Sequence, residues 1–450
     1  MTRGIRFFWP VLAVLSPIFP LTLYFWGNFY DIAEPFSLAM VFGIFAYVYF
    51  LNVLIMSSRI HYFDRLFGHD RVMRFHGYLA FTALLFAVVH RQLKVSVFPF
   101  STFQTQFGQW ALIVFLALIF LTIFVMIPGV LHRIRFYARF RSFLMKKLRL
   151  DYNLLKGIHN GLVLAALLLS FHVFFASSTQ ESWWRMSLMG GWAGAALILW
   201  VRHKIIKPIS LRRKGFTVTE VLPLKDDIVE VRIRPAAVGP ETDKLALNYT
   251  AGQFAFVRFP GSPVGSEEHP FTFSSAPDEP HLAITAKALG NYTSRLKDLS
   301  PGSSVSVDGP YGIFTLRSAG RRPVVFIAGG IGITPILSML KSLKEEDDRE
   351  FLVFWAVQKR ADLVYGNEIE AVAGRLPSMR YVPVLSDDAP GPGEEGGFLT
   401  VDTMRKYMDR GPGEYRYYFC GPPKMRDFVF KGLRETGVKR RDIRYEMFSL

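Results

Sequence analysis

Cysteine is nearly absent from this chain of 450 residues, and the single one is Cys420. One thiol excludes internal disulfides, and it excludes iron–sulfur and zinc sites built from four thiolates. Acidic residues are also scarce, with 37 Asp and Glu against 53 Lys and Arg. Because 50% of the residues are hydrophobic and Phe alone occurs 42 times, we interpret the positive charge as that of a membrane protein with basic cytoplasmic loops. A nucleic-acid-binding protein is not expected.

Long apolar runs are confined to residues 1–210, which we expect to form a transmembrane domain. The runs predict six spans, each near the ~20 residues that a spanning helix needs. They lie at 7–26, 36–56, 75–92, 108–130, 157–176 and 188–206. Three prolines in the first run predict a kink there. After residue 210, short strands and turn glycines predict a soluble part that is long enough for two domains, 211–318 and 319–450.

The charges of the connections predict the orientation of these spans. Residues 27–35 hold Asp31 and Glu34 but no Lys or Arg. The connection after the second span is rich in Arg, and those after the fourth and sixth are rich in both Arg and Lys. The positive-inside rule then places both termini in the cytoplasm, so that the third and fifth spans run outward in parallel.

Two of the apolar runs carry two histidines each. His76 and His90 are 14 residues apart in the third span, and His159 and His172 are 13 apart in the fifth. On a helix either separation is roughly 20 Å, so parallel spans present paired imidazoles at two levels. Two neutral imidazoles suit a six-coordinate haem, and zinc is less expected because no Cys, Asp or Glu accompanies them.

Two points about these histidines stay open. Each could simply be a buried polar residue bonded to a neighbouring helix. A separation of 13 residues does not return to the same helix face, so the fifth span would need tilt, a bulge or local over-twist to aim both rings inward.

The first soluble domain, 211–318, reads as a small antiparallel β-barrel. Its expected strands are 216–222, 228–234, 253–259, 282–287 and 304–308. One segment, HPFTFSSAP (269–277), is a strand ending in small hydroxyl residues. Another, KALGNYTSRL (287–296), is a glycine turn that opens a short helix. Such a turn offers backbone N–H groups to a diphosphate, although Thr293 could equally be an ordinary helix cap.

The second soluble domain, 319–450, reads as strand, glycine loop, helix, strand. The strand PVVFIA (323–328) runs into GGIGITP (329–335), and FLVFWAV (351–357) follows the helix. A third strand, YYFC (417–420), ends in CGPP. This context suits a dinucleotide phosphate. The run is not the common G-x-G-x-x-G pattern, and ordinary packing glycines are the alternative.

HPFT, GNYT, DGPYG (308–312), GGIGITP and CGPP occur in this order, and together they resemble the ferredoxin-NADP reductase family. Preceded by the spans with paired histidines, the whole chain resembles the NADPH oxidase and ferric reductase superfamily, most closely the bacterial NOX-like enzymes. The resemblance implies a six-helix transmembrane haem-binding bundle followed by an antiparallel β-barrel FAD domain and an α/β nucleotide-binding domain. It also implies a bacterial cytoplasmic membrane, with the soluble domains inside.

The resemblance assigns roles to individual residues. His76 with His159 would ligate an inner haem b, and His90 with His172 an outer one. The FAD would contact His269, Pro270, Phe271, Thr272, Lys287, Gly290 and Thr293, with the Thr272 hydroxyl near the flavin ring. NADPH would contact Gly329, Gly330, Gly332, Thr334 and Pro335, and its nicotinamide would border Cys420, Gly421 and Pro422. Phe448 would cover the flavin until nicotinamide displaces it, so Thr272, Cys420 and Phe448 would act closest to the reacting rings.

The basic turn after the second nucleotide-domain strand bears on the choice of nucleotide. Lys359 or Arg360 could pair with a 2′-phosphate, or either could be a solvated surface charge. We therefore expect NADPH in preference to NADH.

The implied function is electron transfer from cytosolic NADPH through FAD and two haems to an acceptor outside. O2 giving superoxide is the expected acceptor, and a ferric chelate attracted by Arg91, Lys94 and Arg185 is the alternative. A transporter or structural membrane protein with a vestigial reductase domain is an alternative of another class. Apart from the lipid bilayer, no obligatory partner is visible.

Overall fold

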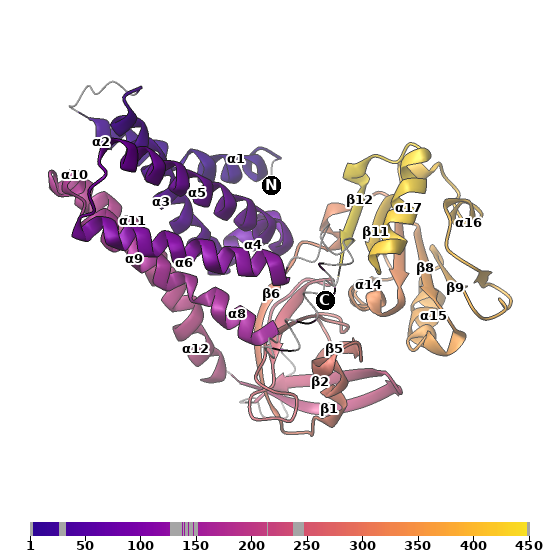
Figure 1. Ribbon diagram of the computed structural model, residues 1–450. Helices are drawn as coiled ribbons and strands as arrows, with labels where there is room; N and C mark the ends of the chain where they lie inside the picture. Colours follow the sequence, from indigo (N-terminus) through magenta and orange to yellow (C-terminus); the bar gives the residue numbers. More distant parts are fainter. Residues whose placement is uncertain are drawn as a thin grey trace. The chain divides into compact units, whose positions relative to one another are not determined.

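The computed structural model describes residues 3–26, 33–126, 137, 139, 143, 147, 152–213, 215–236 and 247–447. The chain divides into two compact units, Met1–Lys207 and Pro208–Leu450. The first unit is helical, and the second holds two six-stranded sheets (Figure 1).

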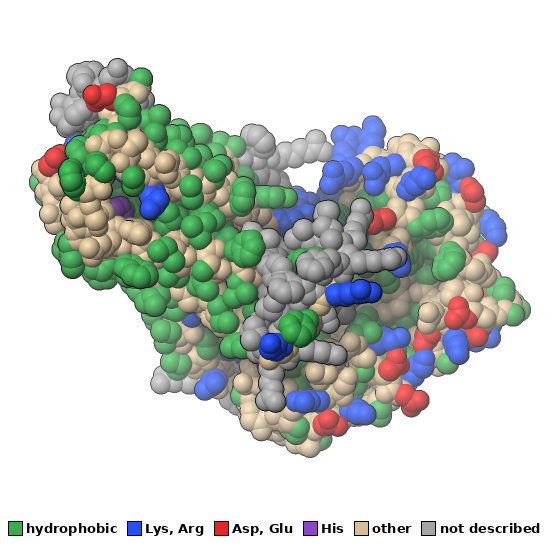
Figure 2. Space-filling view, in the orientation of Figure 1, with side chains coloured by type: hydrophobic (Ala, Val, Ile, Leu, Met, Phe, Trp, Pro, Cys, Tyr) green, Lys and Arg blue, Asp and Glu red, His purple; other side chains and the backbone are tan. Residues whose placement is uncertain are grey.

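Within the described residues, four helices are long and apolar enough to cross a membrane. They are α3 (Pro35–Ser57), α5 (His69–Val97), α6 (Phe103–Met126) and the pair α8 (Tyr152–Asn160) with α9 (Leu162–Phe174). Small buried residues such as Ala83 of α5 and Ala165 of α9 belong to one apolar core that α3, α5, α6 and α9 share. The outer faces stay apolar: Phe120 is 71% exposed and Leu164 62%, and Figure 2 shows hydrophobic side chains over most of the visible face of this unit. So large an exposed apolar surface is compatible with insertion of this unit in a membrane.

The first and sixth predicted spans differ from the observed helices. The first is broken into α1 (Arg3–Leu15) and α2 (Ile18–Phe25) at Pro17, which has no backbone N–H to continue a helix. The sixth is α11 (Trp183–Val201), followed by a π-helical turn, Arg202–Ile206, and α12 (Lys207–Arg213). The basic connection after the fourth span lies almost entirely outside the described residues.

The second unit begins with an antiparallel sheet that confirms the predicted barrel module. Its strands pair in the order β4-β3-β6-β1-β2-β5. They are β1 (Phe216–Lys225), β2 (Ile228–Pro235), β3 (Phe254–Arg258), β4 (His269–Thr272), β5 (Leu282–Lys287) and β6 (Ser304–Tyr311). Alternating apolar residues of these strands, Val231 and Ile284 among them, fill one core.

A parallel sheet follows, in the order β10-β9-β8-β7-β11-β12. Its strands are β7 (Val324–Gly329), β8 (Phe351–Val357), β9 (Met379–Leu385), β10 (Glu395–Gly396), β11 (Arg416–Cys420) and β12 (Ile443–Glu446). The helices α14 (Ile333–Lys341) and α15 (Gly366–Arg375) cover one face, and α16 (Val401–Arg405) and α17 (Pro423–Glu435) cover the other (Figure 1). The loops after β7, β8 and β11 therefore meet at one edge, where α/β sheets bind their ligands.

Candidate functional site

The four predicted iron ligands form two pairs in the helical unit. The rings of His76 and His159 have centroids 6.4 Å apart, and those of His90 and His172 are 6.3 Å apart. A metal atom between two imidazole nitrogens, with bonds of about 2 Å on each side, requires a separation of roughly 6 Å between the ring centres. Both pairs thus fit a bis-imidazole metal site.

Hydrogen bonds hold one nitrogen of each ring. The Nδ1–H groups of His76, His90 and His172 donate to the carbonyls of Val53 (3.1 Å), Ala39 (2.7 Å) and Gln104 (2.8 Å). Because a carbonyl only accepts, each Nδ1 must carry its hydrogen, which leaves Nε2 with a free lone pair.

The fourth ring follows the same rule through a hydroxyl group. Thr122 donates its hydroxyl hydrogen to the carbonyl of Leu118 (2.7 Å), so its oxygen accepts from Nδ1 of His159 (3.2 Å). All four imidazoles therefore present Nε2 as the nitrogen available to a metal. Partners of this kind fix the tautomer and orientation of a ligating histidine.

Two glycines that the sequence analysis did not select make room for the outer pair. A Cβ on Gly43 of α3 would lie 2.7 Å from Nδ1 of His90, and one on Gly108 of α6 would lie 2.9 Å from Nδ1 of His172. Any larger residue would push the ring aside. Helical glycine is otherwise unfavourable by up to about 1 kcal/mol, which is the signal that could have identified these positions.

Gly161 supplies the helix irregularity that the 13-residue separation requires. It interrupts the fifth span between α8 and α9. Its N–H donates to the carbonyl of Ile158 (2.9 Å), and its carbonyl accepts from the N–H of Leu164 (2.9 Å). These bonds join residues three apart, as in the more tightly wound 3₁₀-helix. The extra rotation lets His159 and His172 each meet a partner on α5.

One cation predicted for the outer face is bound inside the helical unit. Arg185 is 4% exposed and donates to the carbonyls of Tyr24 (2.7 Å) and Ser178 (2.8 Å) and to the Glu181 carboxylate (2.9 Å). It therefore ties helices together and is not a free cation for an anionic chelate.

Aromatic side chains lie both on the surface of the helical unit and between its helices. Phe81, one of two phenylalanines between the histidine levels of the third span, is 60% exposed. The closest ring stack among the described residues joins Phe50 of α3 and Phe115 of α6, with centroids 4.0 Å apart and planes 8° apart. This buried pair packs α3 against α6.

In the antiparallel sheet, Tyr292 brings two predicted flavin motifs together. The centroid of its ring lies 3.8 Å from that of the His269 ring and 6.3 Å from that of the Phe271 ring. It belongs to α13 (Asn291–Ser294), and its side chain is buried. HPFT and GNYT therefore lie side by side. Pro270 and Gly290 are exposed there, whereas Thr272 is buried, with 4% of its surface exposed.

Two residues predicted to hold the diphosphate are engaged locally. Thr293 accepts the N–H groups of Leu289 and Gly290, both at 3.1 Å, so it acts as a cap for α13. Lys287 pairs with Asp227 at 3.2 Å, with both side chains partly exposed. A solvent-exposed pair of this kind is weak, so the ammonium can exchange partners.

The two glycine loops of the parallel sheet touch through their backbones. A Cβ on Gly332 would lie 2.2 Å from the carbonyl oxygen of Cys420, and one on Gly329 would lie 2.6 Å from Cδ of Pro422. A Cβ on Gly421 would lie 3.0 Å from Cα of Gly329. GGIGITP and CGPP are thus one site, formed because side chains are missing at three positions.

Several interactions set the shape of this loop pair. Trp355 of β8, which the sequence analysis missed, donates its indole N–H to the carbonyl of Gly330 (2.9 Å), whose φ is +54°. Thr334 donates to the carbonyl of Ile331 (3.3 Å) in the first turn of α14, where Pro335 is also buried.

The structure describes one of the two predicted catalytic residues near the C-terminus, Cys420, but not the other, Phe448. Cys420 is fully buried, and burial raises the pKa of its thiol, so it presents its backbone and not a thiolate to this edge. Phe448 lies outside the described residues.

The basic turn after β8 holds one exposed cation and one cation that is already paired. The Lys359 side chain is exposed. Arg360 donates through Nε (3.0 Å) and Nη2 (2.5 Å) to the carboxylate of Glu394 and through Nη2 to the carbonyl of Ala389 (3.0 Å). The Arg360 guanidinium is therefore already paired with a carboxylate.

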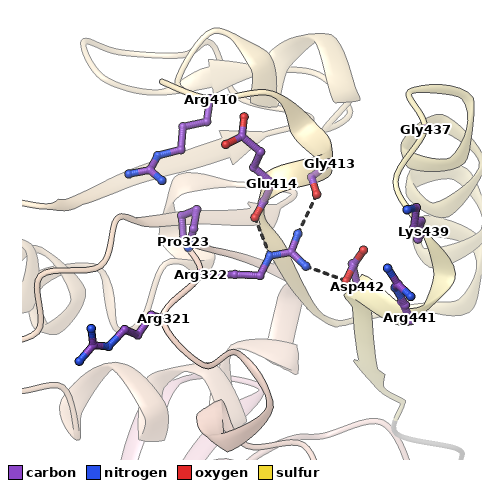
Figure 3. Close-up of a pocket in the computed structure, with 10 residues that line it drawn as sticks. All are labelled: Arg321, Arg322, Pro323, Arg410, Gly413, Glu414, Gly437, Lys439, Arg441 and Asp442. Carbon is purple, nitrogen blue, oxygen red and sulfur yellow. Dashed lines mark hydrogen bonds and ion pairs between the residues drawn. The ribbon is translucent and has the colours of Figure 1, made fainter.

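A separate, strongly basic hollow of about 650 Å³ lies at the opposite edge of the parallel sheet (Figure 3). The lining residues are Arg321, Arg322, Pro323, Arg410, Gly413, Glu414, Gly437, Lys439, Arg441 and Asp442. Arg322 donates to Asp442 (2.8 Å) and to the carbonyls of Glu414 and Gly413. These residues precede β7, β11 and β12, so the hollow is not part of the carboxyl-edge site.

Two family models match the second unit: an FAD-binding domain over residues 213–315 and an oxidoreductase NAD-binding domain over residues 326–431. The reductase component of propane 2-monooxygenase from Rhodococcus jostii is 30% identical over 239 residues, covering 52% of this chain and 62% of the relative. Its counterpart from Mycolicibacterium goodii is 30% identical over 246 residues, covering 51% and 67%.

The electron transfer component of toluate 1,2-dioxygenase from Pseudomonas putida is 30% identical over 237 residues, covering 52% of this chain and 66% of the relative. The chain thus spans a little under two thirds of the first of these relatives. Each match takes up about half of this chain.

Proposed function

We propose that this chain, which from residue 213 onward belongs to the ferredoxin reductase-like FAD- and NAD-dependent oxidoreductases, carries electrons from a cytosolic nicotinamide nucleotide across a membrane. The path runs through FAD and two b-type haems to an acceptor on the outer side, and O2 giving superoxide is the acceptor we favour. The main support for this proposal is that two pairs of facing histidines occur in a chain that also contains the reductase module.

The side chains of the helical unit suit this path. When bound, FAD takes two electrons from a nicotinamide and releases them singly, and haem iron carries one at a time. Nε2 of His76 and His159 would hold one haem, and Nε2 of His90 and His172 the other. The 14 residues between the levels on α5 correspond to about 21 Å of helix, which is most of the ~30 Å hydrocarbon core of a bilayer.

The charges of the connections support an orientation in the bacterial cytoplasmic membrane. The basic loops put His76 and His159 near the cytoplasmic face and His90 and His172 near the outer face. This orientation assumes six spans, of which four described helices meet the requirements of length and apolarity.

The burial of Arg185 removes one of the three cations that could attract a ferric chelate. A chelate site needs free cations on the outer face, and Arg185 is bound on three sides. Lys94, another of the three candidate cations, lies 4.0 Å from the centre of the Phe36 ring.

The test uses the full chain purified in detergent. A haem assay should return two b-type haems per chain, and a reduced-minus-oxidised spectrum should show both reduced by a nicotinamide nucleotide. Reduction of cytochrome c that superoxide dismutase abolishes should accompany turnover. Absence of a b-type spectrum would refute the transmembrane path, and turnover that needs a ferric chelate and yields no superoxide would refute the oxidase assignment.

A further inference from the structure

The edge of the sheet that carries the glycine loops also carries a cluster of carboxylates. Gly329 of β7 pairs with Ala356 of β8, so the residues after β8 lie beside the glycine loop. In sheets of this kind the ribose that bears the 2′ substituent is recognised just after the second strand. Here that position is Gln358 to Arg360.

Arg360, the residue best suited to grip a 2′-phosphate, is held elsewhere. Two of its nitrogens meet the two oxygens of Glu394, which is the bidentate geometry that a phosphate would also use. The guanidinium lowers the pKa of Glu394 to about 2, so the carboxylate stays charged at any physiological pH. The N–H of Gly391 donates to the same carboxylate (2.7 Å) and fixes its place.

Further carboxylates surround the turn. The backbone N–H of Arg360 donates to Asp388 (2.7 Å), and the N–H of Lys359 donates to Asp362 (3.0 Å). The N–H of Asp387 donates to the carbonyl of Gln358 (3.0 Å), which places Asp387 beside the same turn. Asp362 is paired with Lys225, so a phosphate arriving here would chiefly face the like charges of Asp387 and Asp388, whereas a ribose hydroxyl can donate to a carboxylate.

We infer that this site selects NADH over NADPH, and that Glu394 is the positioning residue that withholds Arg360 from a 2′-phosphate. The inference rests on the proposed use of a nicotinamide nucleotide and names which nucleotide is used. It replaces the preference for NADPH expected from the basic turn alone. Lys359 remains an exposed cation of the turn, and Lys225 of β1 pairs with Asp362.

The experiment measures reduction of bound flavin in the full-length protein with NADH and with NADPH. For the wild type, we expect kcat/KM with NADH to exceed that with NADPH by about tenfold or more, the size of one charge-assisted hydrogen bond. Glu394→Gln and Glu394→Ala should move the NADPH-to-NADH ratio toward NADPH by about tenfold. Arg360→Ala in the Glu394→Ala background should abolish that shift.

The adjacent carboxylate supplies a matched control. Glu395 pairs with Lys406 (2.8 Å) and accepts from Tyr407 (2.9 Å), so Glu395→Gln should leave the ratio unchanged. A wild type that prefers NADPH, or a ratio that does not respond to Glu394, would overturn the inference. Flavin reduction does not depend on haem. A missing b-type spectrum would therefore refute the transmembrane path without affecting the measured preference between NADH and NADPH.

Discussion

His172 in the helical unit and Gly332 in the parallel sheet show two opposite ways of building a site. His172 reaches its place because its Nδ1–H meets the Gln104 carbonyl and Gly108 leaves room for its ring. Gly332 matters because it has no side chain, since a Cβ there would lie 2.2 Å from the carbonyl oxygen of Cys420. The first site depends on groups that are present, and the second on the close approach of two backbones.

This difference predicts different failures. Removing a side chain should damage the helical unit locally, because each histidine would serve only one of the two proposed haem positions. Adding a methyl group should damage the glycine loops as a whole, because backbone cannot rotate away as a side chain can. Four predictions test this contrast, starting with the largest expected effect.

The largest effect is expected for His90→Leu or His172→Leu. On the proposed path, either change removes one of the two histidines that would hold the outer haem, so the haem content should fall from about two to about one per chain, while reduction of flavin by the nucleotide survives. A pyridine haemochrome assay and stopped-flow flavin reduction measure the two quantities. The matched control is His69→Leu, because His69 lies on the same helix but pairs with Asp64 (3.0 Å). Retention of both haems in the His90 and His172 variants would disprove the ligand assignment.

Gly332→Ala should lower the free energy of unfolding of the second unit by about 3 kcal/mol, because its methyl group would overlap backbone atoms. Nucleotide-driven flavin reduction should fall with it. Gly374 in α15 has nothing within 4 Å of an added Cβ, so Gly374→Ala should be neutral or slightly stabilising. Denaturant titration of both variants, followed by flavin reduction, decides the matter, and equal stability of the two would contradict a close backbone approach.

Gly108→Ala should have a smaller and more local effect. The added Cβ lies 2.9 Å from Nδ1 of His172, and that ring can shift at the expense of its hydrogen bond. We expect the affinity for the outer haem to fall roughly tenfold, as when an outer-shell partner of a metal ligand is lost. Haem titration of the apoprotein measures it, and Gly191→Ala in α11, where an added Cβ meets nothing within 4 Å, is the control. Identical titrations would show that Gly108 does not position the ring.

The smallest effect is expected for Trp355→Phe. This change removes one hydrogen bond to the carbonyl of Gly330 (2.9 Å), worth about 1 kcal/mol. The KM for the nucleotide should rise a few-fold, with kcat little changed. Tyr407→Phe, which also removes a single hydrogen bond from an aromatic residue of the same unit, should leave KM unchanged. A KM that does not respond to Trp355→Phe would mean that the loop holds its shape without the indole.

Local patterns in the sequence identified many of the elements and candidate residues. Alternation of apolar residues predicted the strands of the barrel module, because one face of each strand is buried. Long apolar runs located the helical unit, since only long apolar helices suit a bilayer. The spacing of His76 and His90 predicted two levels because helix geometry is regular.

Contacts between distant residues could not be predicted in this way. The run 443–446 was not among the predicted strands, because it is only four residues long, yet β12 pairs with β11 at the edge of the parallel sheet. Tyr292, Trp355, Gly43 and Gly108 are ordinary residues in their local context and gain meaning only from what faces them. The capture of Arg360 by Glu394 joins residues 34 positions apart, so a basic turn looked free when it is not.

The sequence by itself determined that this chain pairs a helical unit bearing two histidine pairs with an FAD- and NAD-binding module, because periodicity and turn motifs are local properties. Only the tertiary structure decided which nitrogen of each imidazole is left free, where glycine is required and which cation is already bound. Those outcomes depend on atoms within a few ångströms that are brought together from distant positions, and no local pattern records them.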